Sequence, residues 1–229
     1  MERYESINGN LIARTVEGIE PKQIGFDMQN KRSPVARCFS LLPAPSWIRN
    51  IIHLHIFVIP GLFIGSFRDS KDFAQLESNQ ITHIISVLDA PKKIHQDKKY
   101  LCIEAIDSPE QNLIQYFQIC NDFIHKARLK NQNVLVHCLA GMSRSVTIAA
   151  AYIMSATTIK LKHVLRLLKA CRSIASPNEG FNKQLQYYEC NYLLEERTRL
   201  ASISHSNNQL LADEEYCRKI IQSGEDHKK

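Results

Sequence analysis

Short apolar runs alternate with amphipathic segments along most of the chain from about residue 54 onward. The apolar runs are rich in valine, isoleucine and leucine and are not interrupted by regularly spaced polar residues, which is typical of strands buried on both faces of a sheet. Between these runs, apolar residues recur at helical spacing, for example at positions 113, 116, 117, 120, 123, 124 and 127. Strands that alternate with helices predict an α/β fold with a central, largely parallel sheet flanked by helices.

The limits of these elements follow from turn signals and from changes of period. Pro60 and Gly61 separate the first two runs, as expected for a tight turn. The expected strands cover residues 54–59, 62–64, 83–88, 100–106 and 133–137. The expected helices cover residues 69–78, 113–129, 146–154, 161–170 and 181–194.

Three regions of different character divide the chain. Residues 1–53 lack a steady period, and positions 31 to 50 hold three prolines and four basic residues but no acidic residue, so we expect a poorly ordered N-terminal extension. Residues 54–198 are expected to form the α/β domain. Residues 199–229 are expected to form a polar C-terminal tail with a short helix around positions 212 to 221.

The composition excludes several classes of protein. Hydrophobic residues make up 44% of the 229 residues and charged residues 23%, as in an average globular protein. The net charge of +6 suits an anionic ligand but is too small to indicate binding to nucleic acid. The seven cysteines are odd in number and include no C-x-x-C pair, which argues against a disulfide framework and a zinc ribbon. We therefore expect the protein to function in the reducing interior of a cell.

Signals for membrane attachment are weak. The most apolar stretch, residues 51–64, is 14 residues long and contains two histidines and a proline, whereas a bilayer span needs roughly 20 apolar residues. We therefore expect no transmembrane segment. Glu2 stands where N-myristoylation requires glycine, so no myristoylation signal is expected, and no secretory signal is recognisable.

The segment that indicates chemistry connects the last expected strand to the following helix. Cys138 and Arg144 lie in it, separated by five residues that include Gly141, and Ser143 and Ser145 flank the arginine. Successive backbone N–H groups in a tight strand-to-helix loop form a concave anion site, to which the helix N-terminus adds further N–H groups. The planar guanidinium of Arg144 can bind two oxygens of the anion. The same positive field favours the thiolate form of Cys138, so the loop predicts a nucleophile directed at phosphorus.

The residues of this loop resemble a known signature. Residues 137–145, HCLAGMSRS, resemble the H-C-x-x-G-x-x-R-[ST] signature of cysteine-dependent phosphatases, and the A-G-x-S-R-S part resembles the dual-specificity protein phosphatases in particular. Segments 59–65 (IPGLFIG), 81–87 (ITHIISV) and 176–181 (SPNEGF) are similar to other parts of that family. The nearest likeness is to small atypical members that are usually myristoylated, including one linked to JNK-pathway signalling. This chain differs from them because about 55 unrelated residues replace the short lipidated start.

The resemblance implies a mechanism whose parts can be placed on this sequence. Cys138 would attack phosphorus, Asp107 would act as general acid and then as general base, and Ser145 would donate a hydrogen bond to the sulfur. Asp107 lies in a loop that matches the family's acid loop, although Asp89 and Asp97 lie on nearby loops. The implied catalytic residues are Cys138, Arg144, Asp107 and Ser145, the implied phosphate-binding residues are Leu139, Ala140, Gly141, Met142, Ser143 and Arg144, and the implied supporting residues are His137 and Asn178. Neither a metal nor another cofactor is implied.

The expected function is hydrolysis of phosphotyrosine and of phosphoserine or phosphothreonine in proteins, through a phosphocysteine intermediate. The expected partners are phosphorylated proteins, including those of a MAP kinase pathway, in the cytoplasm and also the nucleus. One alternative is a phosphoinositide phosphatase, which is disfavoured because Leu139, Ala140 and Met142 provide no lysine for a multiply charged head group. The other alternative is an inactive phosphate-binding scaffold, which is disfavoured because cysteine, arginine and acid are all present. The sequence indicates neither the oligomeric state nor the physiological substrate.

Overall fold

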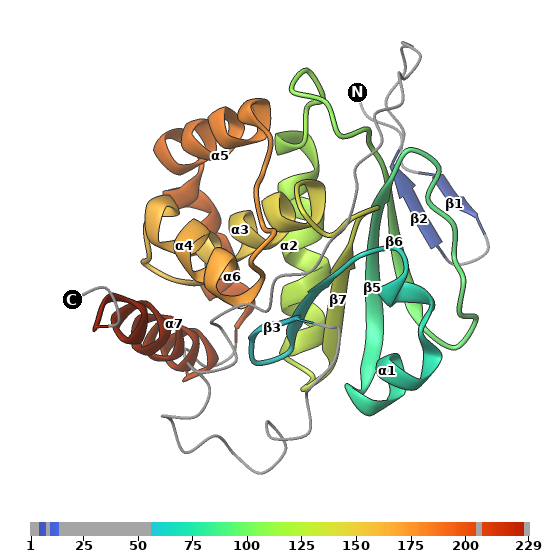
Figure 1. Ribbon diagram of the computed structural model, residues 1–229, viewed down its shortest axis with the longest axis horizontal. Coiled ribbons are helices and arrows are strands. Elements are labelled where there is room, and N and C mark those ends of the chain that lie inside the picture. The colour runs from blue at the N-terminus through green and yellow to red at the C-terminus, as the bar shows by residue number, and fades with distance from the viewer. Residues whose placement is uncertain (1–4, 8–9, 14–55, 205–207, 227–229) are drawn as a thin grey trace.

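The computed structural model describes residues 5–7, 10–13, 56–204 and 208–226, in which a seven-stranded sheet is covered by helices (Figure 1). The spatial order of the strands is β1-β2-β6-β5-β7-β4-β3. Every neighbouring pair from β2 to β4 is parallel, whereas β1 and β3 pair antiparallel at the two edges, so the expected largely parallel sheet is confirmed. The strands are β1 (Glu5–Ile7), β2 (Asn10–Ala13), β3 (Ile56–Ile59), β4 (Leu62–Gly65), β5 (Ile81–Leu88), β6 (Lys99–Glu104) and β7 (Asn133–His137).

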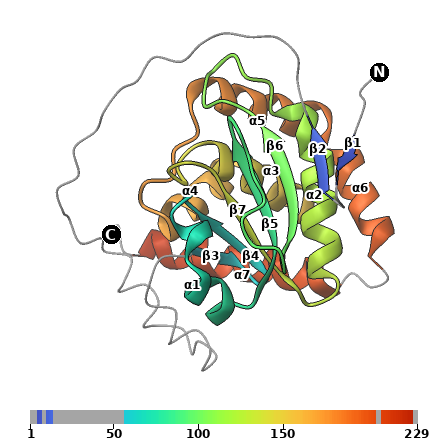
Figure 2. The ribbon, with the colours of Figure 1, turned by 90° about the vertical axis from the view of Figure 1, so that its right-hand side faces the viewer.

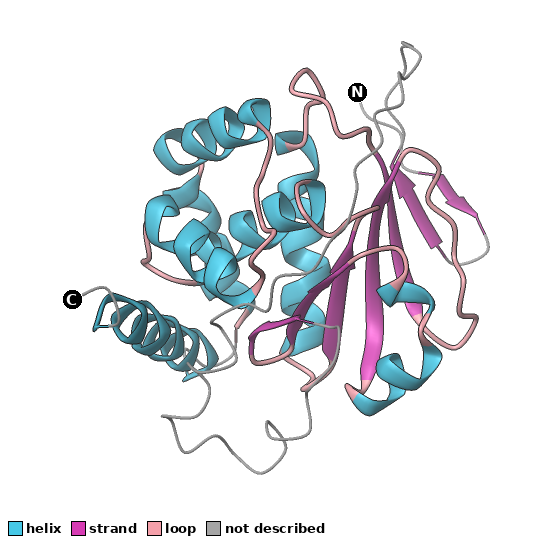
Figure 3. Cartoon of the chain, viewed as in Figure 1, coloured by secondary structure: helices cyan, strands magenta, loops and turns pink. Residues whose placement is uncertain are grey.

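The helices cover the two faces of the sheet unequally. Helices α2 to α6 lie on one face and the short α1 lies on the other (Figures 1 and 3). Two separate apolar clusters follow from this arrangement, a large one beneath α2 to α6 and a small one that includes Leu76 of α1. The helices are η3 (Asp69–Lys71, a 3-10 turn), α1 (Phe73–Ser78), α2 (Ile114–Arg128), α3 (Arg144–Ala156), α4 (Leu161–Cys171), α5 (Glu179–Asn191), α6 (Leu193–Ile203) and α7 (Asn208–Asp226).

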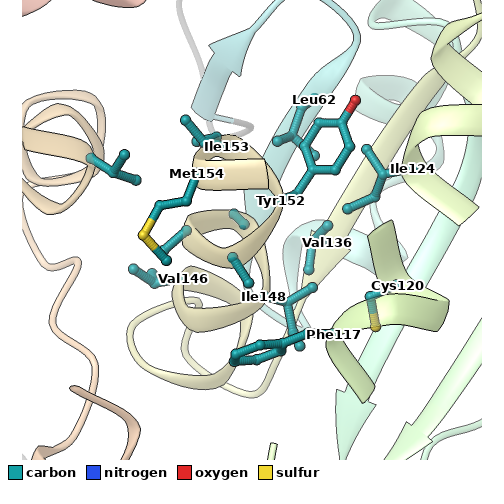
Figure 4. Packing of buried hydrophobic residues seen from close by; sticks show 14 of the residues in the cluster. Leu62, Phe117, Cys120, Ile124, Val136, Val146, Ile148, Tyr152, Ile153 and Met154 are labelled. Carbon is teal, nitrogen blue, oxygen red and sulfur yellow. The ribbon is translucent and has the colours of Figure 1, made fainter. Parts of the chain in front are cut away.

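Helix α3 is the centre of the larger cluster. All of its residues are buried, because it packs between the sheet and the surrounding helices. Figure 4 shows Ile148 and Tyr152 of this helix among Val136 of β7, Phe117 of α2 and other apolar side chains. The helix begins at Arg144, two residues earlier than its apolar pattern predicted, so the arginine of the loop belongs to its first turn.

Two short segments of the N-terminal extension differ from the poorly ordered state that we expected for residues 1–53. Strand β1 pairs with β2, and β2 adds to the sheet along β6, where Ile12 lies opposite Cys102. An open strand edge presents unpaired backbone groups, and pairing satisfies them even though these segments show no long apolar pattern. The remainder of the extension lies outside the described residues.

The C-terminal part of the chain also differs from the expected division. The expected boundary at residue 198 falls inside α6, and the expected tail contains α7, which is longer than the predicted short helix. Helix α7 packs against α4 and lies beside β3 (Figure 2). Its apolar side chains Tyr216, Cys217 and Ile220 join the large cluster, which explains why this polar segment is held on the domain. Within the described residues, no helix combines the length and the apolar character needed to cross a bilayer.

Candidate active site

The site lies at the carboxyl ends of the parallel strands. The loop from Cys138 to Ser143 joins β7 to α3, and the segments that follow β5 and β6 meet it at the same edge of the sheet. Parallel strands bring their carboxyl ends to one edge, where ligands of open α/β sheets usually bind. The order of β6, β5 and β7 thus brings Asp107, Asp89 and Cys138 to the same edge of the sheet.

Cys138 lies at the floor of this site. Only 1% of the residue is exposed, and its Sγ atom is 3.3 Å from the Oγ atom of Ser145 in the first turn of α3. This contact agrees with the expected hydrogen bond between the serine and the sulfur. The N-terminal end of α3 places its positive dipole end and its unpaired N–H groups beside the thiol.

Arg144 is buried beside the cysteine, and it donates hydrogen bonds to the residues that directly follow β5 and β6. Its Nη1 atom donates to Asp89 Oδ1 at 2.6 Å and to the carbonyl oxygen of Ala105 at 2.8 Å. Its Nε atom is 3.6 Å from Asp107 Oδ2 and has no hydrogen-bond partner in the described part of the chain. A buried donor without a partner is costly, so this atom is suited to bind an oxygen of an anion.

Asp107 reaches the same site from the loop that follows β6. Its Oδ1 atom accepts hydrogen bonds from Ser143 Oγ at 2.7 Å and from Asn178 Nδ2 at 2.9 Å. Oδ2 lies on the side of Arg144, and about a third of the side chain is exposed. These two bonds hold the carboxyl group at the mouth of the site, beside the loop.

The two other aspartates considered from the sequence occupy different places. Asp89 enters the site as a partner of Arg144. Asp97 precedes β6 and pairs with Lys98 at 2.9 Å, at the opposite edge of the sheet. The structure therefore brings Asp89 and Asp107 to the loop and keeps Asp97 away from it.

The shape of the loop is fixed by donors that surround it. Arg172 donates to the carbonyl oxygens of Gly141 and Ala140 at 2.7 and 3.0 Å. The backbone N–H of Phe67 donates to the carbonyl oxygen of Leu139 at 3.1 Å. The N–H and C=O groups of one peptide unit point in opposite directions. Because the carbonyl groups of the loop point toward the surrounding donors, the N–H groups of the same peptide units point into the loop. The loop is thereby prepared to bind an anion.

Gly141 is required at its position. Its φ angle is +67°, in the left-handed region that favours glycine, and an added Cβ atom would lie 2.6 Å from the carbonyl oxygen of Gly65. A side chain at this position would push the loop away from β4. The glycine of the signature is therefore explained by both the conformation and the close approach of two backbones.

The two expected supporting residues contact the loop from different sides. His137 is buried, with its ring stacked on that of Phe67 at 6.2 Å between centroids. Asn178 caps α5 by accepting from the backbone N–H of Phe181 at 2.9 Å, and its amide group also donates to Asp107. Asn178 is thus both a helix cap and a residue that positions the carboxyl group.

Sequence reasoning missed Arg172, and with it Asp69. Arg172 follows α4 and is partly buried beside the loop, while Asp69 Oδ2 lies 4.0 Å from its Nη1 atom. Burial lowers the pKa of Arg172, and the nearby Asp69 and Cys138 offset part of this change. No local pattern around position 172 distinguishes this arginine from a surface residue.

The other described cysteines have different surroundings. Cys120, Cys171 and Cys217 lie among apolar groups, and burial raises the pKa of each thiol, to about 12 for Cys171 and Cys217. Such thiols stay neutral and act as small apolar side chains. Cys190 is exposed on α5. Within the described residues, no group of three His, Cys, Asp or Glu side chains is arranged to hold a metal ion.

Comparisons with known proteins show the family to which the chain belongs. The family described as "dual specificity phosphatase, catalytic domain" matches residues 62–191. Dual specificity protein phosphatase 22-B of Danio rerio is 46% identical to this chain, over 72% of this chain and 88% of its own length. Dual specificity protein phosphatase 22 of Homo sapiens is 49% identical, over 58% of this chain and 72% of its own length. The crystal structure of DUSP15 superposes with a TM-score of 0.63 at 43% identity, covering 65% of this chain and 95% of that one.

The site contains a buried cysteine at the end of β7 and a buried arginine in the first turn of α3. The chain belongs to the dual specificity phosphatase family. It is therefore a phosphatase that acts on phosphorylated proteins.

Proposed function

We propose that Cys138 is the nucleophile and that hydrolysis passes through a phosphocysteine. The observation that carries this proposal is the convergence of three groups at one loop: a buried thiol, the Nε atom of Arg144, which has no hydrogen-bond partner in the described residues, and the carboxyl group of Asp107. Because the loop amides and Arg144 are positioned before substrate binds, they stabilise the charge that develops on the equatorial phosphate oxygens.

In the first step, the thiolate of Cys138 forms a bond to phosphorus as the bond from phosphorus to the ester oxygen breaks. The protonated carboxyl group of Asp107 gives its proton to the leaving oxygen. The contacts from Ser143 and Asn178 hold this carboxyl group in place for the transfer. The product of the step is a phosphorylated Cys138 and a free tyrosine, serine or threonine side chain.

In the second step, water attacks phosphorus and the bond from sulfur to phosphorus breaks. Asp107, now ionised, accepts a proton from the water, so that one group serves as acid and then as base. The hydroxyl group of Ser145, 3.3 Å from the sulfur, stabilises the departing thiolate. The cycle returns Cys138 to its thiolate form and releases inorganic phosphate.

The test is hydrolysis of p-nitrophenyl phosphate and of phosphotyrosine and phosphothreonine peptides by the purified chain. We expect wild-type protein to hydrolyse all three and Cys138→Ser to hydrolyse none. Cys190→Ser serves as the matched control, because this exposed thiol is outside the site and its loss should leave turnover unchanged. Wild-type activity in Cys138→Ser would refute the mechanism.

We further propose that the substrates include phosphorylated members of a MAP kinase pathway and that the protein acts in the cytoplasm and nucleus. The likeness to small atypical members of the family supports this proposal at the level of the family alone. The test is dephosphorylation of purified, doubly phosphorylated MAP kinases by wild-type protein and by Cys138→Ser, together with microscopy of the tagged chain. A chain that leaves all of these kinases phosphorylated, or that is confined to another compartment, would contradict it.

A phosphoinositide substrate is less well supported by the site. The side chains of Leu139 and Met142 are exposed at the loop and carry no charge. Inositol head groups with several phosphates would need cations at these positions. Faster turnover of phosphoinositides than of phosphopeptides would reverse this ranking.

A further inference from the structure

Four exposed apolar side chains belong to the phosphate loop or to segments hydrogen-bonded to it. Nine large apolar residues are exposed in the described part of the chain, and Ile106, Leu139, Met142 and Ile174 are among them. We call these four residues the apolar rim. Leu139 is 63% exposed, whereas the neighbouring Cys138 is buried, so the loop directs its nucleophile inward and its apolar side chains outward.

Hydrogen bonds place all four residues at one mouth. Leu139 and Met142 belong to the loop itself. Ile106 precedes Asp107, whose carboxyl group accepts a hydrogen bond from Ser143 of the loop. Ile174 lies in a short segment held at both ends, because Arg172 donates to two loop carbonyls and the backbone N–H of Ser176 donates to the carbonyl of Met142 at 2.8 Å.

Exposed apolar side chains that gather at one place mark an interaction surface. We propose that the apolar rim binds apolar side chains on either side of the phosphorylated residue of a protein substrate. The inference rests on the proposed function, because the phosphate loop fixes where the phosphorylated side chain enters. The rim is continuous with that loop, so a bound peptide must pass over it.

A membrane surface is a less suitable occupant. Asp89 is exposed beside Arg144 at the same mouth, and Asp107 is partly exposed there. Carboxylates would repel the anionic lipids that usually recruit proteins to the cytoplasmic leaflet. They would also repel acidic residues next to the phosphorylated side chain. The charges and the apolar groups therefore favour a singly phosphorylated segment with uncharged, apolar neighbours.

The experiment compares two phosphotyrosine peptides of equal length on the full chain. One carries leucine and isoleucine on both sides of the phosphotyrosine, and the other carries glutamate at these positions. We expect kcat/KM to be about tenfold higher for the apolar peptide, which corresponds to about 1.4 kcal/mol. For each variant, the ratio of the kcat/KM values of the two peptides is compared, because this ratio does not depend on the amount of folded enzyme.

The variants that test the rim are Ile106→Asp and Ile174→Asp. The matched control is Leu194→Asp on α6, because Leu194 is also exposed but lies outside the apolar rim. Each rim variant should lower the ratio of kcat/KM between the apolar and the glutamate peptide to about threefold or less, since an added charge replaces an apolar contact. The control variant should keep the wild-type ratio. Equal rates for the two peptides in wild-type protein, or a ratio unchanged by both rim variants, would overturn the proposal.

A sedimentation experiment with vesicles of phosphatidylcholine and phosphatidylserine covers the membrane alternative. Sedimentation of wild-type protein that Ile174→Asp abolishes would overturn the peptide proposal in favour of a lipid surface. Hydrolysis of p-nitrophenyl phosphate separates this inference from the proposed function. If wild-type protein fails to hydrolyse that small ester, the catalytic proposal itself is wrong, whereas normal hydrolysis without peptide preference refutes the rim alone.

Discussion

Two buried arginines of this molecule have opposite roles, and their surroundings explain why. Arg144 lies at the carboxyl edge of the sheet, where its partner Asp89 is 59% exposed and its Nε atom has no hydrogen-bond partner in the described residues. Arg128 lies at the other end of the domain, where the side chains of Arg128 and Asp213 are each 1% exposed. Both are buried cations, but only Arg144 retains a donor for a ligand.

The surroundings of Arg128 are closed. Its guanidinium binds both carboxylate oxygens of Asp213 at 2.7 and 2.8 Å, the hydroxyl oxygen of Tyr152 at 2.7 Å and the carbonyl oxygen of Pro60 at 2.7 Å. Burial alone would lower the pKa of Arg128, but Tyr152 and Asp213 raise it overall. Because Asp213 belongs to α7 and Tyr152 to α3, this ion pair attaches the C-terminal helix to the central helix.

The difference teaches how a buried arginine can be interpreted. An arginine whose partners are buried with it stabilises a contact between elements, and no donor is left for substrate. An arginine whose carboxylate partner is exposed, and which keeps a donor without a hydrogen bond beside the proposed nucleophile, is suited to bind an anion. Four predictions test this contrast, beginning with the largest expected effect.

Arg144→Ala should lower kcat/KM for p-nitrophenyl phosphate by about 10³–10⁴-fold, because the guanidinium stabilises the transferring phosphoryl group. Its midpoint of thermal unfolding should change little, since the exposed carboxylate of Asp89 is left in contact with water. Steady-state kinetics and calorimetry on the same sample provide the two readings. A loss of stability comparable with that of an Arg128 variant would break the contrast.

Arg128→Met should lower the free energy of unfolding by about 3–5 kcal/mol, because Asp213 is left buried without its partner. Folded protein should keep kcat within about twofold of wild type, as expected for a site distant from the chemistry. Urea titration measures the stability. The double variant Arg128→Met/Asp213→Leu is the control and should recover much of the lost free energy of unfolding. A double variant as unstable as the single variant would show that loss of the ion pair does not cause the instability.

Asp107→Asn should lower kcat for a phenyl phosphate by about 10²–10³-fold, because the leaving oxygen no longer receives a proton. The first step should be less affected for p-nitrophenyl phosphate, whose leaving group needs less protonation. Rapid-mixing kinetics with the two esters compare these losses. If Asp89→Asn shows the same dependence on the leaving group and Asp107→Asn does not, the acid has been assigned to the wrong aspartate.

Arg172→Gln should lower kcat/KM by about tenfold, a smaller effect because this arginine shapes the loop through the carbonyls of Ala140 and Gly141. Arg172 represents the intermediate case between the two arginines, as a partly buried cation that holds the loop through its carbonyl groups. Lys169→Gln, an exposed basic residue of α4, is the matched control and should behave as wild type. An effect of Arg172→Gln as large as that of Arg144→Ala would mean that Arg172 contacts phosphate directly.

The fold and the centre of the site could be predicted because their signals are local. Apolar runs indicated the five strands β3 to β7. The segment from Cys138 to Arg144 contains the proposed nucleophile, the glycine and the arginine within seven consecutive positions. The glycine of that loop and the helix that follows it lie in the same stretch of sequence, although the distant donors Arg172 and Phe67 also hold the loop's carbonyl groups. The sequence therefore indicated the chemistry before any long-range contact was known.

The remaining features depend on contacts between distant positions. Arg144 and Asp89 are 55 positions apart, and Arg128 and Asp213 are 85 positions apart, so no local pattern pairs them. The strands β1 and β2 are short, and their pairing depends on the free edge of β6. Helix α7 was expected to be a polar tail because its apolar residues are few and dispersed, yet Tyr216 and Cys217 pack into the core.

The covalent step at Cys138 is the central claim, and trapping the intermediate tests it most directly. Asp107→Ala mixed with p-nitrophenyl phosphate should accumulate the phosphoryl enzyme, because the second step then lacks its base. Acid quenching followed by peptide mass spectrometry should locate the phosphoryl group on the peptide that contains Cys138, and the Cys138→Ser/Asp107→Ala variant should carry none. A phosphoryl group on any other residue, or rapid turnover in protein that lacks Cys138, would contradict the account.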